Sequence, residues 1–451
     1  MITRIEIDGF KTFRDFSLDL RPFSAIVGAN ATGKSNLFDA LRFISLLAQG
    51  EILSAMQQLR GEPDELFRRE NDDQSTRMTF AVEVLLPKHG SDAFGTDYEI
   101  TSQRLRYEVS LALKSDNLGL PYGIFVDYES CRIIPYPEDT AEYGRKVKIS
   151  RSHRKTAFLE TEFDQHNSPK AFIVRQDGLS EGGATRRGSP QQIPASEASR
   201  TALSTISTAD FRHLYALRHM LIEINFLEIN PQAARRPSDR FEKKKLRSDA
   251  SNLAAALAEL NSIGHRTGSS RRPLADLSSD LSYLIPSVKS VRVRTDEASK
   301  EYAFDVVVSD GNQFSSRVIS DGTLRLLALL AVINSAAVGG ILCFEEPENG
   351  VHEGRIPALV QLLRGATTAE MPDGDFFQII LNTHSPAVLR ALELEELVLA
   401  EMVSGYSEDR TRSDRRTRMR RYMPTKDLFD RGTQLSKHEV EAILKRPHGH
   451  V

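Results

Sequence analysis

The sequence has few cysteines, little net charge and no long uninterrupted apolar segment. Its 451 residues include only two cysteines, Cys131 and Cys343, which lie 212 positions apart. This spacing argues against a disulfide framework and against a zinc site, and it favours a reducing cytoplasm as the location. The 59 Lys and Arg residues and the 62 Asp and Glu residues leave a net charge of −3. Bulk charge therefore identifies no partner, and only local clusters of charge could do so.

The sequence also predicts neither a secretory signal nor a membrane-spanning helix. The N-terminus, MITRIEIDGFKTF, carries charges from its fourth residue and has no apolar h-region, so it predicts a first strand rather than a secretory signal. Residues 326–344 are uncharged, but Asn334–Ser335 and Gly339–Gly340 interrupt them. This stretch therefore predicts a helix over Leu324–Val338 and a short buried strand over Ile341–Phe344, and we expect no membrane span.

The remaining pattern predicts an α/β protein with a strand-rich region. Met78–Val174 alternates apolar and polar residues between turns, which is typical of antiparallel strands. Gln176–Pro194 is rich in Gly, Ser, Gln and Arg and predicts a surface loop. Ser196–Pro286 has helical periodicity, and the last third alternates strand and helix, as in a mostly parallel sheet.

A phosphate-loop pattern follows the third expected strand. Residues 28–36, GANATGKSN, match GxxxxGK[ST] between an apolar strand over Ser24–Val27 and a helix over Lys34–Leu47. Backbone N–H groups of residues 28–33 can surround a β-phosphate, Lys34 can neutralise β- and γ-phosphate oxygens, and the Ser35 hydroxyl can ligate Mg²⁺. A glycine-rich turn that matches by chance is the alternative, but the strand, the loop and the helix all agree with the pattern.

Two further strands end in polar residues. The segment GGILCFEEPENGVH, residues 339–352, contains an apolar strand that ends in two carboxylates. Glu345 would hold the Mg²⁺ shell, and Glu346 could polarise the attacking water. A solvated acidic turn is the alternative. The segment IILNTHSPAVL, residues 379–389, places His384 after a third parallel strand, where it could reach a γ-phosphate. A capped or surface histidine is the alternative.

Taken together, these motifs resemble the heads of ABC-type ATPases. The chain is most similar to the RecF/SMC/OLD-like branch, and within it to the stand-alone bacterial ATPases. The matching segments, in chain order, are GFKTF (9–13), GANATGKSN (28–36), LRSDASNLAAALAEL (246–260), ISDGTLRLLALL (319–330), FEEPENGVH (344–352) and NTHSP (382–386). The resemblance covers residues 1–50 and 245–395.

The resemblance implies an α/β P-loop NTPase fold, an ABC-type head with a β-rich lobe and a helical insertion. Residues 1–195 would form an N-terminal ATPase lobe, 196–286 the helical insertion and 287–451 a C-terminal ATPase lobe. It implies ATP and Mg²⁺ as cofactors, and a homodimer or higher oligomer in which the signature loop caps the γ-phosphate of the opposite subunit.

The resemblance also assigns roles to single residues. Lys34, Glu346 and His384, the switch histidine, would be catalytic, and Ser35 and Glu345 would hold the metal. The nucleotide contacts would come from the Walker A loop and the signature, at Gly28, Asn30, Gly33, Lys34, Ser35, Asn36, Ser320, Asp321 and Gly322. Without the resemblance, SDGT predicts a turn and a helix N-cap, which is compatible with a phosphate site.

The sequence departs from this branch at several points. Ala31 stands where a second glycine is usual, so the loop backbone there should not need a conformation that only glycine adopts. Glu345 replaces the more usual aspartate, and no Q-loop glutamine can be identified. Long heptad arms are missing, so the chain is not an SMC protein proper. The 67 residues after His384 contain no DxD. We therefore expect no TOPRIM nuclease centre in this chain.

Three basic clusters remain, at Arg145–Lys155, Arg235–Arg247 and Arg410–Arg421. Each is either a solvated face or a phosphate contact, and none has interleaved aromatic residues for base stacking.

Duplex DNA and a separately encoded effector protein are candidate partners, and we expect no membrane partner. The sequence thus predicts a cytoplasmic Mg²⁺-dependent ATPase whose dimerisation controls a DNA-related process or an effector, as in phage defence. A self-contained OLD-like nuclease and the nucleotide subunit of a transporter are the alternatives.

Overall fold

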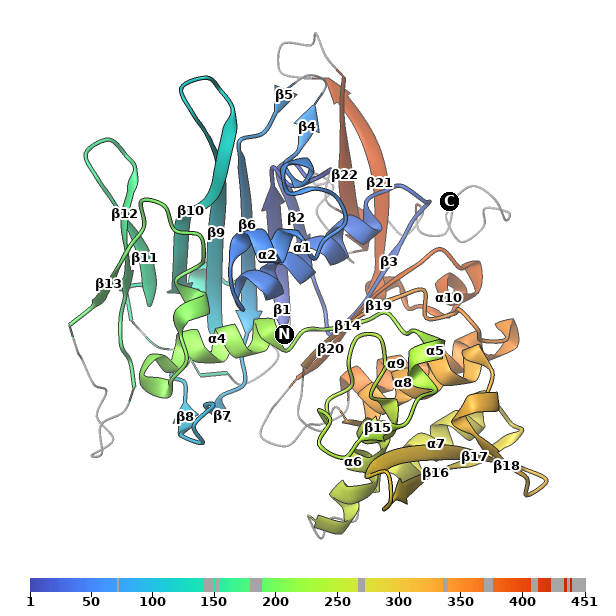
Figure 1. Cartoon of the computed structure of the whole chain (residues 1–451). Helices are drawn as coiled ribbons and strands as arrows, with labels where there is room; N and C mark the ends of the chain where they lie inside the picture. The colour runs from blue at the N-terminus through green and yellow to red at the C-terminus, as the bar shows by residue number, and fades with distance from the viewer. Residues whose placement is uncertain are drawn as a thin grey trace.

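The protein is described here by a computed structural model (Figure 1). The structure describes residues 1–70, 73–141, 149–150, 152, 154–178, 189–266, 272–335, 340–368, 376–406, 413–422, 434–435 and 439. Figure 1 shows a large antiparallel sheet in one half of the molecule, helices α5–α10 in the other half, and β3, β19 and β20 between them.

The large sheet has eight strands in the order β13-β12-β11-β10-β9-β6-β1-β2. All of its pairings are antiparallel. The strands are β1 (Ile2–Asp8), β2 (Phe16–Asp19), β6 (Arg77–Leu85), β9 (Arg104–Ser115), β10 (Pro121–Ile133), β11 (Leu159–Phe163), β12 (Pro169–Val174) and β13 (Gln191–Pro194). The strand-rich prediction for residues 78–174 is confirmed. The loop predicted over residues 176–194 is wrong at its end, because β13 pairs with β12 there; residues 179–188 lie outside the described residues.

A second sheet has seven strands in the order β14-β19-β20-β3-β21-β22-β23. These are β14 (Asn225–Leu227), β19 (Gly340–Glu345), β20 (Phe377–Thr383), β3 (Phe23–Val27), β21 (Leu397–Tyr406), β22 (Ser413–Tyr422) and β23 (Gln434–Leu435). Pairing is parallel except between β21 and β22. Every residue of β3 and β20 is buried, as expected of strands covered on both faces. The prediction of a mostly parallel sheet is confirmed.

The principal helices cover these sheets in two groups. They are α1 (Lys34–Leu47), α2 (Ile52–Met56), α4 (Arg212–Ile222), α5 (Pro231–Ala234), α6 (Leu253–Arg266), α7 (Pro273–Leu284), α8 (Asp321–Ser335), α9 (Ile356–Thr368) and α10 (Pro386–Ala391). A third sheet consists of β15 (Ser238–Asp239), β16 (Val288–Asp296), β17 (Glu301–Val308) and β18 (Gln313–Ser315). The helix predicted over Lys34–Leu47 is confirmed. The helix predicted from Leu324 begins three residues earlier, at Asp321, because Ser320 caps it.

The apolar side chains form two main clusters. Helices α1, α2 and α4 pack with the antiparallel sheet in one cluster, and α6, α7, α8 and α9 pack on the parallel sheet in the other. Residues 196–286, expected as one helical insertion, divide between the two clusters and also contribute β14 and β15. The domain boundaries at residues 195 and 286 stay a prediction. Within the described part of the chain, no helix is long and apolar enough to cross a membrane.

Candidate nucleotide-binding site

The carboxyl ends of three neighbouring strands meet at one edge of the parallel sheet. Thr383 of β20 pairs with Val27 of β3, and Asn382 of β20 pairs with Glu345 of β19. The loops that follow these strands carry the phosphate-loop pattern, Glu346 and His384. Loops after adjacent parallel strands share one edge, so the fold brings the three predicted motifs together.

The phosphate loop leads directly into α1. Its N-cap, Gly33, has a φ of 91°, no side chain caps the helix, and its first turn contains no acidic residue. The leading backbone N–H groups of α1 therefore have no side-chain acceptor within the described structure, which is the arrangement that binds phosphate at a helix N-terminus. Lys34 Nζ donates to the carbonyl oxygens of Gly28 and Ala29, both at 2.7 Å. The ammonium group thus lies inside the loop where phosphate oxygens would be neutralised.

A chain of hydrogen bonds fixes this loop to β22. Thr417 Oγ1 donates to Thr32 O at 3.1 Å and lies 2.7 Å from Thr12 Oγ1, which accepts from Asn36 Nδ2 at 2.8 Å. A Cβ atom on Gly33 would overlap the Thr417 hydroxyl. Asn36, expected to contact nucleotide, is therefore engaged in holding the GFKTF segment against the loop. No local pattern indicates this role of Thr417, because its contact with Thr32 joins residues 385 positions apart.

Ala31 adopts a left-handed backbone conformation, with φ of 62°. This region favours glycine but is open to other residues, so the structure does not contradict the expectation that the position needs no conformation that only glycine adopts. An L-residue with a Cβ atom tolerates this region at a cost of about 1 kcal/mol, so alanine can stand here without losing the loop shape.

The two predicted carboxylates are held by the neighbouring strand. Glu345 ends β19, and its Oε1 accepts from Asn382 Nδ2 at 3.0 Å. Glu346 follows with a φ of 51°, a strained conformation for a non-glycine residue, and its backbone N–H donates to Asn382 O at 2.9 Å. Its Oε1 lies 3.1 Å from His384 Nδ1, and its Oε2 accepts from Asn349 Nδ2 at 2.8 Å. The structure therefore brings Glu346 and His384 into contact.

Burial and the two carboxylates act in opposite directions on the pKa of Lys34. Burial lowers the pKa of Lys34, and the charges of Glu346 and Glu345 act in the opposite direction and raise it. The side chains of Glu346 and His384 are 40% and 51% exposed, so both remain accessible to a ligand. The site thus combines a desolvated cation with two carboxylates at its open side.

Two side chains that the sequence analysis did not assign belong to this site. Glu348 Oε1 accepts from Thr383 Oγ1 at 2.6 Å, and burial raises the pKa of Glu348. Its Oε2 is buried and has no hydrogen-bond partner among the described residues. Arg60 lies 3.8 Å from Glu345 Oε2 and is 64% exposed. Glu348 stands within the EEPEN motif, so its neighbours could have indicated it. Arg60 has no motif around it.

The donors fit a metal that is held partly by phosphate. Among the described residues, no group of three or more His, Cys, Asp and Glu side chains is arranged to hold a metal by itself. Mg²⁺ in nucleotide sites is typically held by one or two protein oxygens together with phosphates and water. Ser35, half-buried at the start of α1, and Glu345 match such a minimal set.

The signature segment begins α8 and packs against the loop that follows β19. Ser320 Oγ accepts from Thr323 N at 3.2 Å and caps α8, and Asp321 pairs with Arg235 at 2.5 Å. Gly322 packs so closely on Gly350 that a Cβ atom would overlap the Gly350 carbonyl. Ser320 and Asp321 are exposed. In the part of the chain that the structure describes, the side-chain hydrogen bonds of Ser320 and Asp321 are made with Thr323 and Arg235, not with the phosphate loop.

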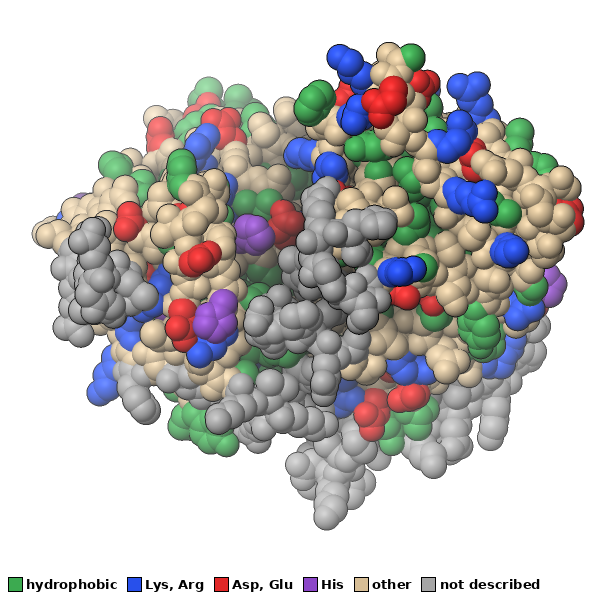
Figure 2. Space-filling view, turned by 90° about the horizontal axis from the view of Figure 1, so that it is seen from below, with side chains coloured by type: hydrophobic (Ala, Val, Ile, Leu, Met, Phe, Trp, Pro, Cys, Tyr) green, Lys and Arg blue, Asp and Glu red, His purple; other side chains and the backbone are tan. Residues whose placement is uncertain are grey.

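The basic clusters are mostly ion-paired. Five of the seven cations in Arg235–Arg247 have carboxylate partners, in the pairs Arg235–Asp321, Arg240–Glu297, Lys244–Glu259, Lys245–Glu223 and Arg247–Glu242. This favours the solvated-face interpretation. Figure 2 shows Lys and Arg side chains interspersed with acidic ones on the face seen from below. Most of Arg145–Lys155 lies outside the described residues.

The cluster at Arg410–Arg421 overlaps strand β22. Arg420 is buried and pairs with Glu401 and Glu439, and buried Arg421 donates to the backbone carbonyls of Asp19 and Glu395. The phosphate-contact interpretation is wrong for these two residues, because their guanidinium groups are used inside the fold.

The fold and this site define a protein with a P-loop NTPase head fold. The head domain of an Smc protein, solved bound to the C-winged helix domain of ScpA, superimposes with a TM-score of 0.51 at 12% identity over 92% of this chain and 97% of that one. An Smc head domain from Pyrococcus yayanosii covers 98% of each chain at 10% identity and a TM-score of 0.48. The predicted P-loop NTPase head fold is confirmed.

The family itself follows from the sequence match. Residues 23–390 match the family described as "AAA domain, putative AbiEii toxin, Type IV TA system", and the chain belongs to this family. The chromosome partition protein Smc of Methanocaldococcus jannaschii is 48% identical over 44 residues, which is 10% of this chain. The match spans only 4% of that protein's length.

Proposed function

We propose that this protein binds ATP with Mg²⁺ at the edge of the parallel sheet and hydrolyses it, with Glu346 as the general base. The observation that supports this most is the contact between Glu346 and His384 beside the Lys34 loop. Glu346 would accept the proton of the attacking water, while His384 and Lys34 would hold the γ- and β-phosphate oxygens. The magnesium ion, held by Ser35 and Glu345, would neutralise phosphate charge. The exposed guanidinium of Arg60 lies near enough to Glu345 to contribute positive charge there.

Glu346→Gln tests this assignment. The amide cannot accept a proton from water, so we expect hydrolysis to fall by about 100-fold while ATP binding is retained. Lys34→Ala should instead weaken ATP binding, because the loop loses its cation. Turnover by purified protein and ATP affinity by calorimetry give both values. A Glu346→Gln protein that hydrolyses ATP at the wild-type rate would remove Glu346 from the mechanism.

The second part of the proposal is that two chains complete each site. The exposed N-terminus of α8, with Ser320 as its cap, would cover the γ-phosphate of a second copy bound at Lys34. Lys34→Ala and Ser320→Arg should each be inactive alone. Mixing them should restore ATPase activity, because one heterodimer site then has both native residues. No recovery in a mixture that exchanges subunits would contradict the shared site.

The process served is proposed from the relatives. The family description includes a toxin of a toxin–antitoxin system, and the superimposed Smc head was solved with a ScpA domain bound. Both support a head of the RecF/SMC/OLD-like branch that controls a DNA-related process or a separately encoded effector, as in defence against phage. Purification from its host with crosslinking should recover such a partner in an ATP-dependent manner.

A metal-dependent cleavage assay tests the nuclease alternative, and membrane fractionation tests the transporter alternative.

A further inference from the structure

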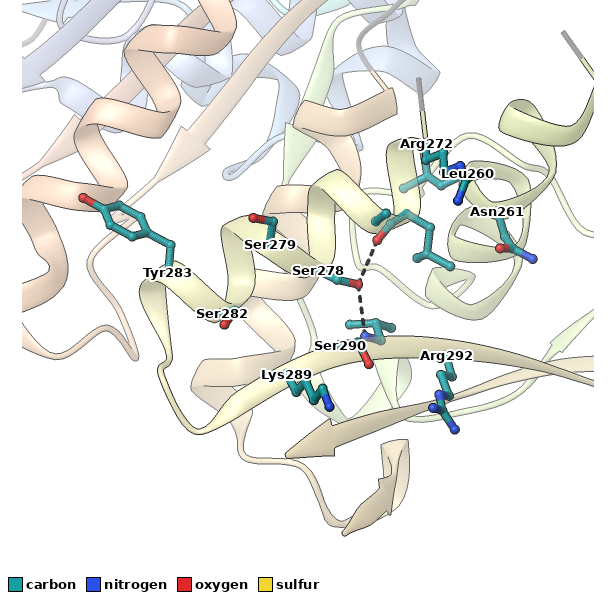
Figure 3. Close-up of a pocket in the computed structure, with 13 residues that line it drawn as sticks. Leu260, Asn261, Arg272, Ser278, Ser279, Ser282, Tyr283, Lys289, Ser290 and Arg292 are labelled. Carbon is teal, nitrogen blue, oxygen red and sulfur yellow. Dashed lines mark hydrogen bonds between the residues drawn. The ribbon is translucent and has the colours of Figure 1, made fainter. Parts of the chain in front are cut away.

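A large polar pocket lies away from the nucleotide site, between α6, α7 and β16 (Figure 3). Its volume is about 1340 Å³. The wall where α7 meets β16 is fixed by Ser278, whose hydroxyl donates to Leu274 O at 2.8 Å and accepts from Val291 N at 3.1 Å. Pockets for small molecules typically measure about 300–1,000 Å³, so this volume favours an extended ligand.

Three exposed cations line the pocket. Arg272 precedes α7, and Lys289 and Arg292 project from β16. Among the described residues that line the pocket, none is acidic. Within the described chain, no carboxylate lies within ion-pair distance of any of the three. This differs from the Arg235–Arg247 cluster, where most cations have a carboxylate partner.

The arrangement of these cations suits a chain of anions rather than one ion. Figure 3 shows Arg272 and Asn261 on one side of the space between α7 and β16, and Lys289 and Arg292 on the other. Lys289 and Arg292 are three residues apart on a strand, which separates their backbones by about 10 Å. Cations spaced along the strand in this way can each meet a different phosphate of one nucleic-acid strand.

The uncharged lining favours nucleic acid over an acidic protein segment. Serine hydroxyls and an asparagine amide, at Ser279, Ser290 and Asn261, accompany the cations. These are the side chains that contact phosphate and sugar in nucleic-acid complexes. Leu260, Leu274 and Val291 also line the pocket, so aliphatic surface accompanies the polar groups. Tyr283, the aromatic residue among the described lining residues, points away from the other labelled side chains.

We propose that this pocket binds the phosphate backbone of a nucleic-acid strand through Arg272, Lys289 and Arg292, without reading its bases. The site lies outside the three basic clusters identified from the sequence. It does not depend on ATP hydrolysis, so its success or failure is independent of the proposed ATPase mechanism.

The test is the salt dependence of binding to a fluorescein-labelled 20-nucleotide DNA strand, measured by anisotropy without ATP. The variant is Arg272→Gln/Lys289→Gln/Arg292→Gln in the full chain. Loss of three phosphate contacts should reduce the slope of log K against log salt by about 2, and weaken binding about 100-fold at 0.1 M salt. Circular dichroism and basal ATP hydrolysis should remain at wild-type values, because none of the three residues lies in the nucleotide site.

The matched control is Arg240→Gln/Lys244→Gln/Lys245→Gln, which removes the same formal charge from ion-paired cations. We expect its salt slope to stay near the wild-type value. Equal losses in both variants, or wild-type binding by the pocket variant, would overturn the proposal. Tripolyphosphate and polyglutamate serve as further probes. If the pocket variant loses affinity for either of them but keeps its affinity for the DNA strand, the ligand is a free phosphate compound or an acidic protein segment, and the nucleic-acid assignment is wrong.

Discussion

Buried polar side chains of the antiparallel sheet and those at the functional edge of the parallel sheet lie in different surroundings. In the antiparallel sheet, Arg104 of β9 is fully buried and its donors are satisfied by Asp139, by Thr3 Oγ1 at 2.7 Å and by Val84 O at 2.9 Å. Glu129 of β10 likewise accepts hydrogen bonds from Tyr107 and from the backbone of residues 202 and 203. Fully satisfied networks of this kind specify and rigidify a fold.

The edge of the parallel sheet is different. Glu346 has a left-handed backbone, and Lys34 is desolvated next to carbonyl oxygens. Glu348 has a buried oxygen for which the described part of the chain supplies no partner. Each of these features costs stability in the isolated protein. Strained and incompletely satisfied groups cluster where a fold serves function rather than stability. The difference teaches that polar burial alone does not identify a site; the site is marked by backbone strain, a desolvated cation and carboxylates that meet at one sheet edge.

Removing Arg104 should produce the largest loss of stability. Arg104→Ala leaves the buried carboxylate of Asp139 without its partner, so we expect unfolding free energy to fall by about 3–5 kcal/mol. Urea denaturation measures this value. Arg132→Ala is the control, because its pair with Glu138 is exposed and should contribute less than about 1 kcal/mol. Equal losses for both variants would remove the distinction between the sheets.

Glu129 predicts a pH dependence in the same sheet. Burial raises the pKa of Glu129 from its ordinary 4.5 to about 7. The folded state therefore holds this proton to higher pH than the unfolded state does. The associated stability is present below pH 4.5 and is lost as pH rises towards 7, by up to about 3 kcal/mol. Denaturation between pH 5 and 8 should show this slope in the wild type and a flatter one in Glu129→Gln. Parallel slopes would contradict the prediction.

Relieving the backbone strain at Ala31 should change stability least, and it tests whether the phosphate loop stores strain. Ala31→Gly removes the left-handed strain of the loop and should stabilise the protein by up to about 1 kcal/mol. Ala29→Gly is the matched control in the same loop and should destabilise it, because glycine only adds freedom to the unfolded chain. Thermal unfolding distinguishes the two variants. A loss of stability in Ala31→Gly would mean that the loop stores no strain there.

Local pattern was enough to predict the strand, loop and helix around Lys34, the strand that ends at Glu345, and the parallel sheet. Each depends on residues close in sequence, whose periodicity and turn chemistry carry the signal. The anchoring of the phosphate loop by Thr417 could not be predicted, since that contact joins opposite ends of the chain. The arginines of β22 were misinterpreted for the same reason. A run of cations gives no indication that Glu401 and Asp19 will meet them in the folded protein.

The central claim is that the polar edge of the parallel sheet serves chemistry at the expense of stability. The most direct test measures ATP turnover and urea unfolding on the same Glu346→Gln protein. We predict that turnover falls by about 100-fold, as for loss of a general base, while the free energy of unfolding stays within about 0.5 kcal/mol of the wild type or rises. Wild-type turnover together with a stability loss as large as that of Arg104→Ala would contradict the claim, because Glu346 would then be a structural residue.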